Sequence, residues 1–152
     1  MKKIVVALDY NSSAEKVAEM GNLLAKAIKA DLILVHVIRE PEYYSPDYSP
    51  LMGFQGGYTT NVMGPIENIK KEAVNFLTAI AQHLGGHAIK TEILEGETAE
   101  AILEYSKSCN ANFIVMGSHS HKGIDRLLIP DVAAHILRHS KIPLLTIPTG
   151  DI

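Results

Sequence analysis

The sequence predicts an α/β fold of the doubly wound type, a three-layer sandwich with helices on both faces of a parallel sheet. Two observations favour this class. Segments with strand composition alternate along the chain with segments of helical spacing, and the strands expected at residues 4–8, 32–38 and 113–116 are apolar throughout. A strand that is apolar on both faces is typical of a parallel sheet buried between two layers of helices.

The first strand, helix and second strand have the spacing of a βαβ unit with a right-handed crossover. The strand at 4–8 ends at Asp9, and Ser12 followed three residues later by Glu15 is a capping-box signature for a helix start. We expect this helix to direct one apolar face toward the sheet, made of Val17, Met20, Leu24, Ala27 and Ile28.

Residues 39–64 interrupt this alternation with turn and loop composition and hold four of the six tyrosines. A loop insertion of this length in a compact domain is commonly a surface segment, a ligand lid or a partner-binding arm. The surface insertion is the favoured interpretation, and the other two stay open.

The second half of the chain continues the alternation. A helix is predicted to start at Gly64-Pro65, with Pro in the first helical position, and to stop at Gly85-Gly86. The strand at 89–93 alternates apolar and charged residues, as an edge strand does. A helix from about Thr98, a helix from near Asp131 and a strand at 143–147 complete the order. The two helices are expected to turn inward Ala99, Ile102, Leu103, Val132, Ala133, Ile136 and Leu137.

Bulk properties limit the class of protein. A length of 152 residues suits one domain, 1–152, and the net charge of −3 offers no basic excess for binding nucleic acid. No apolar run reaches the length of a membrane span, and the five apolar residues between the basic start and Asp9 are too few for the core of a signal peptide. The single Cys109 fits a reducing compartment. We therefore expect a cytoplasmic protein that binds neither membrane nor nucleic acid.

The strand at 113–116 ends in a loop of Gly, Ser and His that leads toward a helix start. In this fold the ends of the first and fourth strands flank the crevice where the strand order reverses and ligands bind. A small-residue loop before a helix N-terminus commonly cradles a phosphate. The crevice is therefore the candidate binding site.

Other candidate chemistry is weaker. His119 and His121 lie two apart in a loop, short of a zinc signature, so no metal site is predicted. His36 is expected to be a satisfied core or crevice residue, and Cys109 a structural thiol. The chain has no hydrolase elbow, no Walker loop and no set of nucleophile, base and orienting group. We therefore expect no catalytic residues and a protein that is not an enzyme.

The final strand is short and apolar, and connectivity places it at an edge of the sheet. Such an edge invites pairing with another chain. We predict a homodimer that pairs through Pro143, Leu144, Leu145, Thr146 and Ile147.

Together, the order and spacing of these motifs resemble the universal stress protein family over almost the whole chain. The resemblance is carried by the first strand with Asp9, Ser12 and Ser13 after it, by residues 34–37, 95–96, 115–119 and 123–128, and by the closing segment 136–145. It implies a five-stranded parallel sheet of order 3-2-1-4-5, a dimer formed through the last strand and a role in stress response. Some members of the family bind ATP.

Members that bind ATP use Gly, two residues, Gly, nine residues, Gly, then Ser or Thr. Here these four positions hold Gly117, Ser120, Pro130 and Asp131. Pro130 has no N–H to donate to a phosphate, whereas Asp131 suits the N-cap of the last helix. A carboxylate about 4 Å from a phosphate charge is repelled by roughly 1 kcal/mol in water, and by more in a partly buried site. The pattern therefore disfavours tight binding of a triphosphate.

The positions that contact adenosine in the family are better kept. Asp9 stands where the family has a carboxylate, and Val37 where the adenine packs, although Asp9 has the alternative role of organising the turn. A site that keeps the base and ribose contacts but loses those to the terminal phosphates favours AMP, ADP or a signalling nucleotide over ATP, or binds nucleotide only weakly. We therefore expect a stress-response or regulatory dimer; the alternative is an enzyme that hydrolyses a nucleotide slowly in the same crevice. The predicted nucleotide-facing residues are Asp9, Val37, Met116, Gly117, His119, Ser120, Asp131 and Val132.

Overall fold

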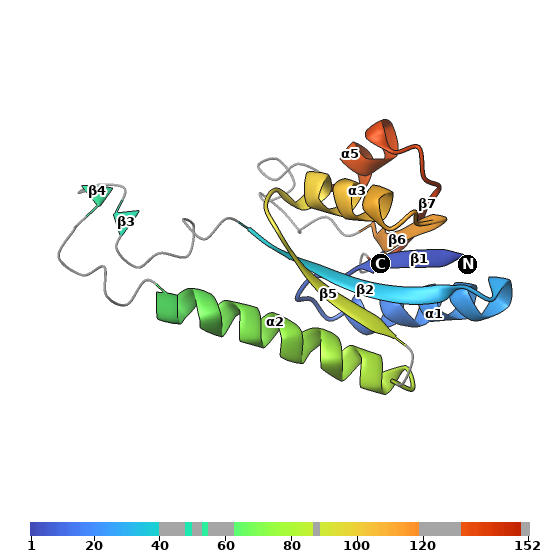
Figure 1. The fold of residues 1–152 in the computed structure, drawn as a ribbon, viewed down its shortest axis with the longest axis horizontal. Coiled ribbons are helices and arrows are strands. Elements are labelled where there is room, and N and C mark those ends of the chain that lie inside the picture. Colours follow the sequence, from blue (N-terminus) through green and yellow to red (C-terminus); the bar gives the residue numbers. More distant parts are fainter. Residues whose placement is uncertain (40–47, 50–52, 55–62, 87–88, 119–131, 150–152) are drawn as a thin grey trace.

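A computed structural model describes residues 1–39, 48–49, 53–54, 63–86, 89–118 and 132–149 of the chain. At its centre is a five-stranded parallel sheet of order β5-β2-β1-β6-β7, drawn in Figure 1. Its strands are β1 (Lys3–Ala7), β2 (Asp31–Ile38), β5 (Lys90–Glu95), β6 (Phe113–Gly117) and β7 (Leu144–Ile147). Numbered among these five, the order is the predicted 3-2-1-4-5, which confirms the doubly wound fold.

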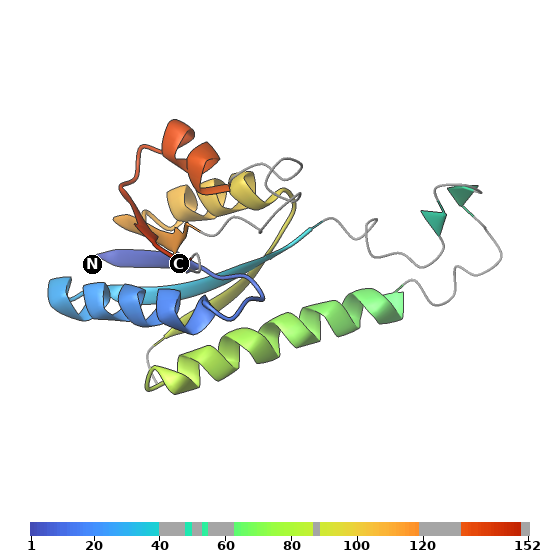
Figure 2. The same ribbon diagram turned by 180° about the vertical axis from the view of Figure 1, so that it is seen from behind.

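Two pairs of helices sandwich the sheet. One face is covered by α1 (Ala14–Ile28) and α2 (Met63–His83), and the other by α3 (Thr98–Ser108) and α5 (Val132–His139), as Figures 1 and 2 show from opposite sides. The middle strands are buried on both faces because each meets a helical layer. The side chains with no exposed surface include Ile4, Val5, Val6, Leu34, Val35, Ile114 and Val115.

Helix α1 starts differently from the predicted capping box. Its N-cap is Ser13, which makes no side-chain capping bond. Instead the Asn11 side-chain oxygen accepts the Ser13 N–H at 2.8 Å, so an Asx turn precedes the helix. The capping box of Ser12 and Glu15 is therefore wrong, because the side chain of Asn11 already organises the turn.

The buried face of α1 also differs from the prediction. Val17 is buried as expected, but Met20 is 39% exposed and Ala27 is exposed. Small residues face the sheet because the helix lies close to it, and the larger Leu24 and Ile28 pack at the margin of the core. The buried residues of α1 are Ala14, Val17, Ala18, Gly21 and Ala25.

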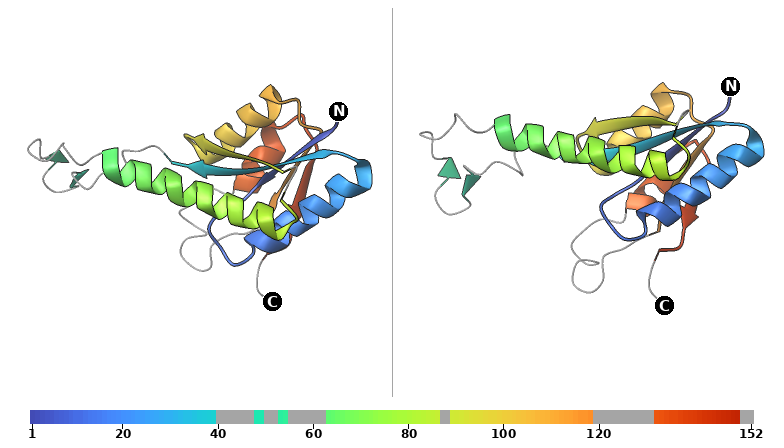
Figure 3. Two further views of the ribbon diagram at one scale, coloured as in Figure 1. Left: turned by 60° about the horizontal axis from the view of Figure 1, so that its bottom comes forward. Right: turned by 90° about the horizontal axis from the view of Figure 1, so that it is seen from below.

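Helix α2 begins at Met63, so Pro65 is its third residue and not its first. Proline fits there because the N–H groups of the first helical turn have no partner within the helix. The predicted end is confirmed: Gly85 and Gly86 have φ of 103° and 65°, and the Gly86 N–H donates to the Ala81 carbonyl at 2.9 Å. Figure 3 shows the amino-terminal part of α2 extending past the sheet.

The insertion predicted at residues 39–64 contains two short paired strands. β3 (Tyr48–Ser49) and β4 (Gly53–Phe54) are antiparallel, with Tyr48 opposite Phe54. Its remaining loop residues, 40–47, 50–52 and 55–62, lie outside the described residues.

The last two helices largely match the predicted pattern. Glu97 is the N-cap of α3, and its side chain accepts the Glu100 N–H at 3.0 Å. Ala99 and Ile102 are buried as predicted. In α5, Ile136 has no exposed surface, but Leu137 is 67% exposed, so its predicted inward orientation is wrong. Leu137 lies about 100° around the helix from Ile136, beyond the narrow stripe that an eight-residue helix buries here.

Candidate functional site

The crevice lies beyond the carboxyl ends of β1 and β6. These strands are neighbours, but the chain leaves β1 through α1 on one face of the sheet and leaves β6 toward α5 on the other (Figure 1). Ala7 of β1 is level with Val35 of β2 and Met116 of β6. The ladder continues one residue further, because the Leu8 N–H donates to the Val35 carbonyl at 2.9 Å. This is the switch point where open α/β sheets bind ligands.

Three of the predicted site residues share one apolar cluster. Val37, Met116 and Val132 belong to one cluster with Ile136 and Ala7, on the face covered by α3 and α5. Met116 is 7% exposed, whereas Val37 and Val132 are half-buried. The structure therefore brings residues from β2, β6 and α5 together as an apolar floor at this end of the sheet.

Asp9 stands exposed just after β1 and takes part in the turn that follows. Its carboxylate accepts a hydrogen bond from the side-chain amide of Asn11. Asn11 in turn accepts the backbone N–H of Ser13 on its side chain and that of Ala14 on its carbonyl, at 2.8 and 3.2 Å. The turn-organising role considered for Asp9 is thus observed.

Gly117 lies in close contact with the carboxyl-terminal segment, which its sequence motif did not indicate. A Cβ on this residue would lie 3.0 Å from Thr149 Cγ2 and 3.4 Å from Val17 Cγ2. The close approach that Gly117 permits is therefore that of the carboxyl-terminal segment, which passes beside α1. Lys16 holds this segment through a 2.9 Å bond from Nζ to the Pro148 carbonyl, and the Ser118 N–H donates to the Ile147 carbonyl at 2.8 Å.

Three further predicted contact residues, His119, Ser120 and Asp131, lie outside the described residues, as does Pro130. Their part in the site remains a prediction from the sequence.

An aromatic cluster that sequence reasoning missed lies behind the crevice, on the face covered by α1 and α2. His36 is 7% exposed, and its Nδ1–H donates to the Leu8 carbonyl at 2.8 Å. Its expected role as a satisfied residue is confirmed. The rings of Tyr10 and Phe76 meet His36 with centroid distances of 4.5 and 5.8 Å, and each other at 4.8 Å. Only the fold brings Phe76 of α2 to the end of β1, so spacing in the sequence gives no signal for this cluster.

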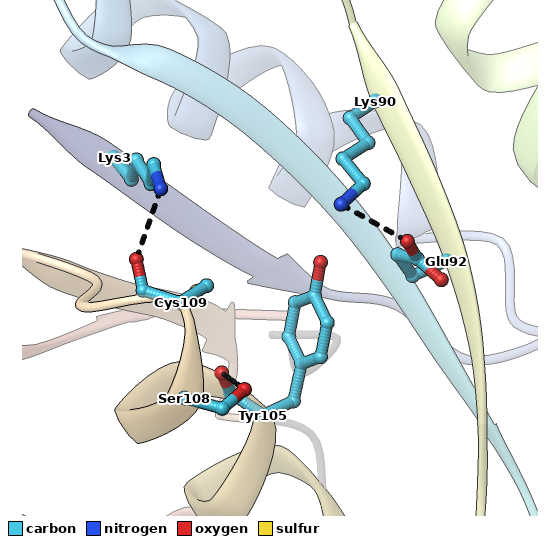
Figure 4. Close-up of polar contacts among 6 residues, drawn as sticks. All are labelled: Lys3, Lys90, Glu92, Tyr105, Ser108 and Cys109. Atoms are coloured by element: carbon cyan, nitrogen blue, oxygen red, sulfur yellow. Dashed lines mark hydrogen bonds and ion pairs between the residues drawn. The ribbon is translucent and has the colours of Figure 1, made fainter. Parts of the chain in front are cut away.

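A separate groove of about 720 Å³ runs beside edge strand β5 and α3. Tyr105 lines it, and in Figure 4 its hydroxyl points toward the Lys90–Glu92 ion pair, which measures 3.1 Å. Burial raises the pKa of Tyr105, and the Lys90 ammonium opposes part of that rise. The groove is lined by Leu94, Glu95, Ala101, Glu104, Tyr105, Lys107 and Ser108.

Cys109 lies near this region and is half-buried. Its thiol contacts the Ser106 carbonyl at 3.6 Å, and Lys3 Nζ donates to the Cys109 carbonyl oxygen, not to the sulfur, at 3.2 Å (Figure 4). Lys3 thereby binds a carbonyl at the carboxyl end of α3, where a cation is favoured. The contacts agree with the structural role expected for this cysteine.

The predicted pairing strand β7 lies at an edge of the sheet, where β6 is its one partner among the described residues. Ile147 is buried inside the chain, and Leu144 is half-buried. The exposed part of the predicted interface is therefore Pro143, Leu145 and Thr146.

Within the described residues, no three or more His, Cys, Asp or Glu side chains gather in a way that could hold a metal ion. In the same residues no helix combines the length and the apolar character that crossing a membrane requires.

The topology is that of the doubly wound α/β proteins, a class in which ligands commonly bind at the carboxyl ends of the strands. The model of the Universal stress protein family matches residues 1–148. The chain belongs to the universal stress protein family.

Two curated relatives from Methanocaldococcus jannaschii have similar lengths. Universal stress protein MJ0531 is 26% identical over 96% of this chain and 81% of its own length. Universal stress protein MJ0577 is 28% identical over 96% of this chain and 94% of its own.

Solved structures share the fold. That of MJ0577 has a TM-score of 0.76 at 22% identity and covers 99% of this chain and 98% of its own. A universal stress protein in complex with cAMP has a TM-score of 0.63 at 24% identity and covers 96% of both chains. The universal stress protein from Archaeoglobus fulgidus in complex with dAMP has a TM-score of 0.58 at 17% identity and covers 96% of this chain and 97% of its own.

Proposed function

We propose that this protein is a cytoplasmic, non-catalytic regulatory dimer of the stress response whose crevice binds adenosine monophosphates in preference to ATP. The observation that carries the proposal is the apolar floor at the switch point. Val37, Met116 and Val132 converge there from three elements, as a flat purine base requires. The exposed carboxylate of Asp9, at the end of the central strand, lies at the same edge and can accept hydrogen bonds from ribose hydroxyls.

The preference for a monophosphate rests on the positions that would hold further phosphates. Pro130 offers no N–H, and Asp131 places a negative charge where ATP-binding members have a hydroxyl. Two structural neighbours are complexes with cAMP and dAMP, both nucleoside monophosphates. ADP is expected to bind between AMP and ATP in affinity.

Calorimetry with AMP, ADP and ATP on the purified chain tests this proposal. AMP should bind more tightly than ATP, and Asp9→Ala should weaken AMP binding. Asp31→Ala is the matched control, because Asp31 is an exposed carboxylate at the opposite, amino-terminal end of β2. Tighter binding of ATP than of AMP by the unaltered chain would overturn the proposed preference.

A gain-of-function variant tests the physical reason for that preference. Pro130→Gly combined with Asp131→Ser restores an N–H donor and replaces the carboxylate with a hydroxyl. Its affinity for ATP should rise more than its affinity for AMP, because only the triphosphate reaches these positions. Equal gains in affinity for both nucleotides would show that Pro130 and Asp131 do not disfavour ATP through its additional phosphates.

The second candidate is an enzyme that hydrolyses a nucleotide slowly in the same crevice. The observation in favour of this candidate is that Asp9 places an exposed carboxylate at the site. Phosphate release from ATP that Asp9→Ala abolishes and Asp31→Ala leaves intact would favour the enzyme over the binding module.

A further inference from the structure

Two histidines, His135 and His139, face each other on α5. His135 and His139 are four residues apart, so they lie on one side of the helix. Their rings stack with centroids 4.3 Å apart and planes 26° apart. His139 is exposed and His135 half-buried, whereas Ile136 is buried in the core. The pair is therefore accessible from solvent on a helix fixed to the sheet.

The hydrogen bonding of His139 leaves its outer nitrogen available as a ligand. Its Nδ1 lies 2.8 Å from the His135 carbonyl oxygen. A carbonyl only accepts, so Nδ1 carries the proton and Nε2 of the neutral ring keeps its lone pair. Histidines that bind metals characteristically donate their other ring N–H to a carbonyl or carboxylate, which fixes the tautomer and orients the ring. His139 already has this arrangement.

The position on the helix also suits a cation. His139 is the last residue of α5, where the unpaired carbonyls carry a partial negative charge, and His135 lies one helical turn before it. Arg138 follows His135 by three residues and therefore neighbours it on this face of the helix, so its positive charge opposes part of this effect. An imidazole nitrogen binds a metal through a lone pair in the ring plane, so the stacked rings must turn toward each other before one ion, at metal–nitrogen distances of about 2.0–2.1 Å, bridges them.

We propose that His135 and His139 form a two-imidazole chelate for a divalent transition metal of borderline softness, with Cu²⁺ bound more tightly than Ni²⁺ or Zn²⁺. Within the described residues no third His, Cys, Asp or Glu joins them, so water completes the coordination. This site is independent of the crevice and of the proposed nucleotide.

Metal titration of the full-length chain tests the proposal, with Ni²⁺ alone in calorimetry and Cu²⁺ alone in electron paramagnetic resonance. One site per chain and a Cu²⁺ spectrum with two nitrogen ligands are expected. His135→Gln and His139→Gln should each weaken binding at this site about tenfold or more, because either change removes the intramolecular second ligand. Circular dichroism should show that both variants fold, since glutamine is tolerated on a helix surface.

Two controls separate this pair from the other histidines. His83→Gln removes an exposed histidine on α2 and should leave metal binding unchanged. The double variant His119→Gln with His121→Gln removes the other closely spaced pair in the sequence and should keep the two-nitrogen spectrum. Affinity within about twofold of the unaltered chain in both α5 variants, or loss of the spectrum in the loop variant, would overturn the proposal.

Discussion

Gly21 marks the place where α1 lies closest to the sheet. A Cβ added there would come within 2.5 Å of Val6 Cγ2, and Val6 has no exposed surface. Valine has a single side-chain torsion with few allowed rotamers, so it cannot turn aside within a packed core. Gly21→Ala should therefore destabilise the protein by about 1–3 kcal/mol, although alanine is the better helix former by about 1 kcal/mol. Urea denaturation followed by circular dichroism measures the change.

Gly117→Ala is the matched control for this prediction. Its new Cβ would meet Thr149 Cγ2 at 3.0 Å, in a partly exposed segment near the carboxyl terminus that has room to shift. The loss of stability should be smaller than for Gly21→Ala. A Gly21→Ala variant as stable as the unaltered protein would show that α1 can move away from the sheet at little cost.

At the scale of elements, α5 depends on one deeply buried residue. Ile136 has no exposed surface, and its neighbour Leu137 is 67% exposed. Ile136→Ala should cost about 2–5 kcal/mol of stability through lost burial and the cavity that remains. Leu137→Ala removes a similar side chain from the surface and should change stability by about 0.5 kcal/mol or less. Equal effects in thermal or urea unfolding would contradict the observed orientation of α5.

The contact between α1 and α2 includes an ion pair that responds to pH. His83 Nε2 lies 2.9 Å from Glu19 Oε1, and this hydrogen bond, followed by the charge of Glu15, raises the pKa of His83 above 6.5. Since the folded state favours the protonated ring, the pair stabilises the fold below the ordinary pKa and loses this effect as pH rises through the raised pKa.

Titration of His83 followed by nuclear magnetic resonance checks this pair. Glu19→Gln should lower the pKa of His83 toward 6.5, and Glu15→Gln should lower it less, because the contribution of Glu15 comes second to the hydrogen bond. An unchanged pKa in Glu19→Gln would show that the two side chains do not pair in solution.

The helix starts and faces show how far sequence patterns extend. The Ser12–Glu15 spacing fits a capping box, yet Asn11 organises the turn first, and nothing in the spacing decides between the two side chains. The predicted face of α1 gave weight to large apolar residues such as Met20. Close contact between helix and sheet instead selects Ala18 and Gly21, and this depends on the distance of α1 from the sheet, which the local sequence does not contain.

At the scale of the whole molecule, the fold was predictable because alternating buried strands and helices allow few arrangements. The apolar floor of Val37, Met116 and Val132 is a consequence of this fold, because the ends of β2 and β6 and the start of α5 meet at one edge of the sheet. The packing of Gly117 against Thr149 was not predictable, because it depends on where a segment distant in the sequence passes. The same holds for the contact of Phe76 with His36.

The two edges of the sheet differ in a way that bears on assembly. The β5 edge carries Lys90, Glu92 and Glu95, and charged residues on an edge strand oppose pairing with another chain. The β7 edge has no charged residue between Leu144 and Ile147, and Leu145 is 37% exposed. The proposed dimer therefore uses the β7 edge.

Sedimentation of Leu145→Lys tests this assignment. A lysine at the centre of β7 should convert the dimer to a monomer, because two equivalent strands related by a twofold axis would bring two like charges into one interface. Leu137→Lys places the same charge on the exposed surface of α5 and should leave the dimer intact. A Leu145→Lys variant that sediments like the unaltered protein would move the interface away from β7, since the strand offers no other exposed large apolar side chain with which to pair.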